Sequence, residues 1–177
     1  MLLSVITGCT SLTLEVTENQ NQDLLLIRKA FEQNLHDTPE NESGSTWHSG
    51  WLGNILINMA PDGKHRGLCH HWQKRIYQGV LPAARESGWG ITGIVINQGT
   101  IFEHHAVLVY QPETINRRDI LSYKYRDNVF ILDAWRRGKA DIFTLRDWLK
   151  LHLVYRVEAA LEGLSVADIH TAETLQE

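Results

Sequence analysis

The chain has 177 residues, of which 43% are hydrophobic and 21% are charged, and its formal net charge is -4 with a pI near 6.1. This length and hydrophobic content are typical of one globular domain with a substantial core. A nucleic-acid-binding protein usually has a strongly basic face, so the acidic balance argues against a nucleic-acid partner.

The first nine residues carry a pattern of protein export. Residues 1–8 are mostly apolar and end Ile6-Thr7-Gly8 directly before Cys9. This order resembles the lipobox of bacterial lipoproteins, which implies that residues 1–8 are a signal remnant and that Cys9 is lipidated. The protein would then lie on the periplasmic side of the cell envelope, held to the membrane by a lipid anchor. The alternative is an apolar terminus without a targeting role, because the segment lacks the basic start and longer apolar region of a secretory signal.

The next segments divide a tether from a folded body. Residues 9–22 are polar and predict a flexible tether, so we expect one domain over residues 23–170 and a frayed end over residues 171–177. No segment of the sequence approaches the roughly 18 uninterrupted apolar residues of a membrane-spanning helix. Apolar residues at three- and four-residue steps predict a helix over residues 23–36, and residues 37–46 predict a loop.

Two more helices are expected before the middle of the chain. Residues 47–59 keep a helical spacing of apolar side chains. After a Pro-Asp-Gly turn, a second helix begins near Cys69, and Pro82 is expected to kink or restart it. Its apolar face consists of Cys69, Trp72, Ile76 and Val80. Cys69 is therefore expected in the first helical turn, facing the interior.

The second half changes to the pattern of strands. Residues 91–96, 102–110 and 129–132 are apolar runs bounded by Gly, Asn or Asp, and they predict three strands of an antiparallel sheet. Residues 97–100 are short enough for a hairpin, and residues 144–151 predict a helix capped by its first residue. The expected fold class is α+β, with the N-terminal helices and the cysteine-bearing helix packed on a small antiparallel sheet.

Cys69 is the residue that most directly indicates chemistry. The chain has two cysteines, and if Cys9 is lipidated, Cys69 has no partner for an internal disulfide. A cysteine at a helix N-terminus feels the positive end of the helix dipole, which favours the thiolate. The thiolate is the nucleophilic form, and a catalytic thiolate needs an imidazole within reach and a third group to orient that imidazole.

Two strands supply candidates for these partners. His105 stands at the head of the apolar strand, and Asp133 closes the strand that follows. His104 competes for the role of base, and strand alternation puts it on the opposite face from His105.

Cysteine at a helix start, His105-Ala106 at the head of an apolar strand, and Leu132-Asp133 followed by a small residue and Trp135 resemble the transglutaminase-like branch of the papain superfamily. The resemblance covers about residues 47–148 and implies a papain-like fold. It implies Cys69 as nucleophile, His105 as base and Asp133 as orienting acid, with no metal and no other cofactor. The reaction would hydrolyse a peptide or amide bond or transfer its acyl group to an amine. The substrate would be a peptide or protein, with cell-wall peptide as one candidate from the envelope location.

The oxyanion of such a reaction needs hydrogen-bond donors. The backbone N–H of Cys69 is one donor. Trp51, Asn54, Asn58 and Trp135 are the side-chain candidates for the oxyanion or substrate site.

Two other functions stay open. Cys69 and the histidines around it, His65, His70, His71, His104 and His105, are dense enough to form a zinc site. A lipid-anchored module of the same fold could instead bind peptides or act as a scaffold without catalysis. The sequence leaves undecided the substrate, the acceptor, the oligomeric state and the choice between the two adjacent histidines.

Overall fold

The computed structural model describes residues 22–37, 46–59 and 65–159. Cys9, the predicted signal remnant and nearly all of the tether lie outside the described residues, as does the predicted frayed end. The described elements are α1 (Gln22–His36), β1 (Thr46–Trp47), α2 (Gly50–Met59), β2 (His65–Arg66), α3 (Cys69–Glu86), β3 (Gly90–Ile96), β4 (His104–Tyr110), β5 (Phe130–Asp133), β6 (Asp141–Thr144), α4 (Leu145–Lys150) and β7 (Val157–Ala159). Two short 3-10 turns, η1 (Arg117–Asp119) and η2 (Tyr123–Tyr125), lie between β4 and β5.

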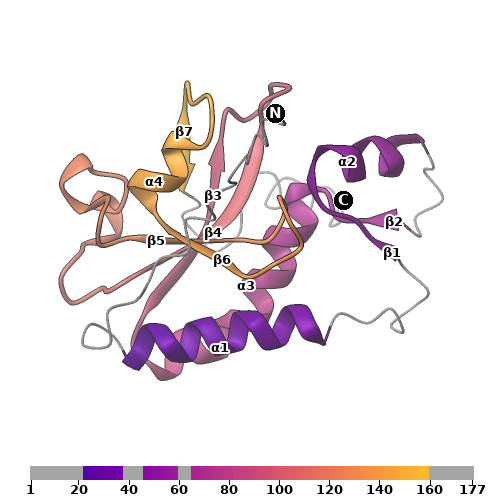
Figure 1. The fold of residues 1–177 in the computed structure, drawn as a ribbon. Helices are drawn as coiled ribbons and strands as arrows, with labels where there is room; N and C mark the ends of the chain where they lie inside the picture. Colours follow the sequence, from indigo (N-terminus) through magenta and orange to yellow (C-terminus); the bar gives the residue numbers. More distant parts are fainter. Residues whose placement is uncertain (1–21, 38–45, 60–64, 160–177) are drawn as a thin grey trace, which may run out of the picture.

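The centre of the fold is a five-stranded antiparallel sheet in the order β6-β5-β4-β3-β7 (Figure 1). The predicted α+β class and the three predicted strands are confirmed, and β3 and β4 pair as the expected antiparallel hairpin. The sequence pattern missed β6 (Asp141–Thr144), because it is short and has a polar residue at each end, so it forms no apolar run.

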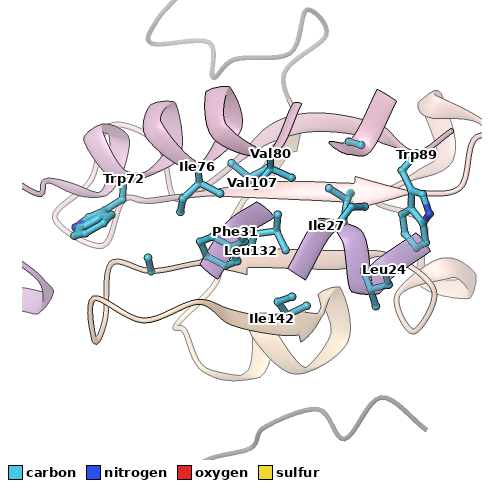
Figure 2. Close-up of a cluster of buried hydrophobic side chains, with 13 residues drawn as sticks. Leu24, Ile27, Phe31, Trp72, Ile76, Val80, Trp89, Val107, Leu132 and Ile142 are labelled. Carbon is cyan, nitrogen blue, oxygen red and sulfur yellow. The ribbon is translucent and has the colours of Figure 1, made fainter. Parts of the chain in front are cut away.

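α1 and α3 pack together on one face of the sheet (Figure 1). Figure 2 shows the side chains that join them to the strands, and all are almost completely buried: Leu24, Ile27, Phe31, Trp72, Ile76, Val80, Trp89, Val107, Leu132 and Ile142. The α3 members recur at four-residue steps, so they form one stripe over the sheet. This stripe fixes the direction in which α3 presents its N-terminus.

α4 covers the opposite face of the sheet. Leu145 and Trp148 are fully buried there against a second cluster that includes Leu108 and Ile131. The predicted cap is confirmed, since the Asp147 backbone N–H donates to Thr144 Oγ1 at 3.1 Å. The sheet therefore has one apolar cluster on each face.

The structure corrects one helix boundary and one of the two effects expected of Pro82. The helix predicted over residues 47–59 begins only at Gly50, because Trp47 belongs to β1, which pairs in parallel with β2. Pro82 lies inside α3, which continues to Glu86 without restarting. Within the described ranges, no helix combines the length and the apolar character needed to cross a membrane.

Candidate active site

Cys69 is the first residue of α3, as the sequence predicts. Gly67 has a φ of +120°, and a Cβ at this position would lie 2.0 Å from the backbone oxygen of His48, so only glycine fits the approach to the helix. The N-cap residue, Leu68, provides no side-chain hydrogen bond to the helix. Leu68 therefore does not cap the first backbone N–H groups of α3. These groups lie at the helix end that carries Cys69, where they favour a negative charge on the sulfur.

A buried histidine–aspartate pair lies at the end of the sheet next to this helix. His104 Nε2 is 2.7 Å from Asp133 Oδ2, and the two residues are only 3% and 2% exposed. The Trp148 indole N–H donates to the same oxygen at 2.9 Å, and the Trp135 backbone N–H donates to Asp133 Oδ1 at 3.0 Å. Asp133 is thus held by three donors and can orient the imidazole of His104.

The histidine paired with Asp133 is His104, not the His105 chosen from the sequence. His105 Nε2 instead lies 2.6 Å from Glu103 Oε1. The cause is the register of the sheet: Leu108 pairs with Ile131, so the residues two and four positions back from Leu108 share a face with Asp133. His104 is one of those residues, and His105 points to the other face.

The pKa values of Cys69 and His104 are shifted toward each other. Burial raises the pKa of the Cys69 thiol, but hydrogen bonds with His104 and His70 and the charges of His105 and His104 outweigh burial and lower the pKa from 9.0 to about 6. Burial lowers the pKa of His104, but Asp133 and then Cys69 outweigh it and raise the pKa from 6.5 to about 9. Between these two values the pair exists as thiolate and imidazolium.

The remaining nitrogen of His104 is consistent with this pairing. Nε2 is engaged by Asp133, and Nδ1 is buried and makes no hydrogen bond of regular geometry with the described residues. Nδ1 is therefore the nitrogen available to the neighbouring thiol. Burial raises the pKa of Asp133, but the charge and hydrogen bond of His104 and the two tryptophan donors outweigh it and lower the pKa, which keeps the carboxylate ionised.

His152 is a site residue that the sequence analysis missed. Its ring lies 4.8 Å from the ring of His104, at 30°, and 4.9 Å from that of Trp148. Burial, followed by the charge of His104, lowers its pKa from 6.5 to about 4, so it stays neutral beside the imidazolium. It lies in the loop after α4, and no local pattern in that loop points to the site.

The predicted oxyanion and substrate candidates differ in their connection to this centre. The Trp135 ring lies 4.8 Å from the ring of His104, and its indole N–H donates to Asn54 Oδ1 at 3.1 Å. Asn54 is therefore linked to the site by its hydrogen bond with Trp135, and its Nδ2 group is a candidate donor to the substrate. Trp51 is 71% exposed, and Asn58 is exposed near the end of α2. Of the three residues from α2, Asn54 is the one that the hydrogen bonds tie to the centre.

The zinc alternative is not supported by the placement of its ligands. His65 belongs to β2, ahead of α3, and its Nδ1 lies 2.9 Å from His48 Nε2, so it does not share a helix face with Cys69. In the part of the chain that the structure describes, the group of potential metal ligands is His104, Asp133 and His152, with donor atoms within 4.8 Å of one another.

A metal in that group would have to break the existing hydrogen bond. Two ligands of a tetrahedral zinc ion at about 2.0–2.1 Å are separated by roughly 3.3 Å. The 2.7 Å between His104 Nε2 and Asp133 Oδ2 is shorter and is the distance of a charge-assisted hydrogen bond. The arrangement thus favours a positioned base over a metal centre.

No family model matches the chain, and no curated protein and no solved structure matches it at a significant level.

Proposed function

We propose that this protein is a thiol-dependent enzyme that hydrolyses a peptide or amide bond, or transfers its acyl group, through Cys69, His104 and Asp133. The observation that carries the proposal is the 2.7 Å pair of His104 and Asp133 beside a helix-start cysteine whose pKa is lowered to about 6. Nucleophile, base and orienting acid each come from a different element, so their convergence is a product of the fold.

The first half of the reaction forms an acyl-enzyme. The Cys69 thiolate attacks the carbonyl carbon of the substrate, and the negative charge moves to the carbonyl oxygen. The Cys69 backbone N–H and Asn54 Nδ2 are the candidate donors to that oxygen. The carbon–nitrogen bond then breaks as protonated His104 gives its proton to the leaving amine, which leaves a thioester on Cys69.

The second half releases the acyl group. An acceptor attacks the thioester while neutral His104 takes its proton, and the carbon–sulfur bond breaks to restore the thiolate. The acceptor is water in a peptidase or amidase and an amine in a transglutaminase. Asp133 remains ionised throughout and stabilises the imidazolium at the stages where His104 is protonated.

The finer classification as a papain-like, transglutaminase-like fold is part of this proposal. It is supported by the chain order of cysteine, histidine and aspartate and by the packing of the cysteine helix on an antiparallel sheet. The histidine in that order is His104, one residue before the position chosen from the motif.

The envelope location remains a prediction, because Cys9 lies outside the described residues. If it holds, the substrate is a peptide or protein of the envelope, with cell-wall peptide as one candidate. Intact mass of the mature protein tests it, since Cys9 should be the N-terminal residue and should carry a lipid.

The test of the catalytic proposal is the reactivity of Cys69. In full-length chain carrying Cys9→Ser, so that one thiol remains, Cys69 should react with iodoacetamide near neutral pH at least about tenfold faster than a model thiol, because thiolate dominates above its lowered pKa. His104→Ala should remove most of that advantage, whereas His105→Ala should retain the greater part of it. Slow labelling that is insensitive to His104 would sink the proposal.

The same preparation separates the two other functions. Stoichiometric zinc that survives dialysis and blocks labelling would favour the metal site. A labelled but catalytically silent protein that binds peptides would favour the non-catalytic module.

A further inference from the structure

A second histidine–carboxylate pair lies on the opposite face of β4. His105 is 1% exposed, and its Nε2 is 2.6 Å from Glu103 Oε1. The other carboxylate oxygen of Glu103 accepts from the Gly99 backbone N–H at 2.6 Å. Both oxygens are therefore engaged, and the hairpin between β3 and β4 holds the imidazole of His105 in one orientation.

This second pair reaches the sulfur of Cys69 through His70. The rings of His105 and His70 are 6.1 Å apart in an edge-on arrangement. His70 is the neighbour of Cys69 on α3 and hydrogen bonds with its thiol. His104 and His70 thus both act on the nucleophile, and His105 lies in edge-on contact with His70.

The catalytic steps proposed above use none of these three groups. His105 Nδ1 is buried and has no hydrogen-bond partner among the described residues, although the ring stands at the active end of the sheet. Burying an imidazole with one nitrogen unpartnered is costly, so a structural role alone does not account for it.

We propose that Glu103, His105 and His70 form a positioning network that orients the His70 and His105 rings beside the Cys69 sulfur and so helps to stabilise the thiolate. This inference rests on the proposed function and deepens it, because it assigns a regulator to the same nucleophile. His104 moves protons to and from the substrate, whereas the second network exchanges no proton with the substrate and acts on the sulfur of Cys69.

The charges around the sulfur agree with this division. Burial raises the pKa of Glu103, but the hydrogen bond from the Gly99 backbone and the hydrogen bond and charge of His105 outweigh burial and lower the pKa. The carboxylate of Glu103 therefore stays ionised. The charge of His105 is among the causes that lower the pKa of Cys69. The titratable groups that surround the sulfur, directly or one residue behind, are His70 and His71 from α3, Glu103, His104 and His105 from β4 and its approach, Asp133 from β5, and His152 from the loop after α4.

The test is the pH midpoint of Cys69 alkylation, measured in full-length Cys9→Ser protein. The midpoint should lie near pH 6 in this parent. His105→Phe, which keeps the bulk of the ring and removes its charge, should raise the midpoint by about one pH unit, and Glu103→Gln should raise it by roughly half a unit. Glu113→Gln, at an exposed position in the loop after β4, is the matched control and should leave the midpoint unchanged.

The measurement is repeated in His104→Ala, which removes the catalytic base. There the midpoint should still lie below the ordinary thiol value, and adding Glu103→Gln should raise it again. Midpoints that stay within about 0.2 pH units of their parent in both backgrounds would overturn the inference without touching the proposed triad. Loss of rapid labelling in the parent itself would overturn the proposed function, and the His104→Ala series would still decide the role of Glu103.

A double variant tests the route through His70. If the network acts as one unit, His70→Gln and Glu103→Gln should shift the midpoint together by less than the sum of their separate shifts. Additive shifts would overturn the network and leave two independent residues.

Discussion

His104 and His105 are neighbours in the chain, each with its own carboxylate, yet the two pairs have different surroundings. Their nitrogen–oxygen distances are nearly equal, at 2.7 Å and 2.6 Å. The side chain of Asp133 is 1% exposed and receives two further hydrogen bonds, whereas that of Glu103 is 30% exposed at a hairpin. The two hydrogen bonds have nearly the same length but should contribute unequally to stability, because water can replace Glu103 but cannot reach Asp133.

Removal of Asp133 should affect the protein most strongly. In Asp133→Ala, the His104 imidazolium and the Trp148 indole lose their acceptor in a site that water does not reach. We expect the free energy of unfolding to fall by about 3–5 kcal/mol, measured by urea denaturation near neutral pH. Rapid labelling of Cys69 should be lost as well.

The matched control is Glu103→Ala. Since its carboxylate is partly exposed, its loss should lower the free energy of unfolding by about 1 kcal/mol or less. Equal losses for the two variants would contradict the distinction between a buried pair and a surface-accessible pair.

The pH dependence of stability isolates the charge on His104. The pKa of His104 is raised from 6.5 to about 9 on folding, so its contribution to stability is complete below pH 6.5 and is lost as the pH rises toward 9. The pKa of Cys69 is lowered from 9.0 to about 6, so its contribution is complete above pH 9 and is lost as the pH falls toward 6. In the unaltered protein the stability contributions of His104 and Cys69 change with pH in opposite directions.

Cys69→Ala should remove the opposing contribution, so that the pH dependence of stability due to His104 can be measured. We expect the free energy of unfolding of this variant to fall by on the order of 1–2 kcal/mol between pH 6.5 and pH 9, measured by urea denaturation across that range. Adding His104→Gln should flatten the curve. A flat or rising curve in Cys69→Ala alone would mean that Asp133 does not hold the proton on His104.

Local patterns were enough to predict much of this site. Apolar steps of three and four residues placed Cys69 at a helix start, and apolar runs bounded by Gly, Asn or Asp placed the two adjacent histidines near the start of one strand and Asp133 at the end of the next. They missed His152, which lies in a loop, and they extended the helix of α2 back over Trp47, whose partner strand β2 contains only two residues. Contacts made by loops and by very short strands leave no period in the sequence.

Local patterns in the chain are enough to assign residues to elements and to show that adjacent histidines on a strand face opposite ways. Which of the two histidines meets Asp133 depends on how the strands pair in the folded protein. The physical reason is that side chains alternate with a period of two, so a shift of one residue in the pairing of β4 with β5 would exchange the roles of His104 and His105. That register depends on packing both faces of the sheet at once, with α3 on one side and α4 on the other.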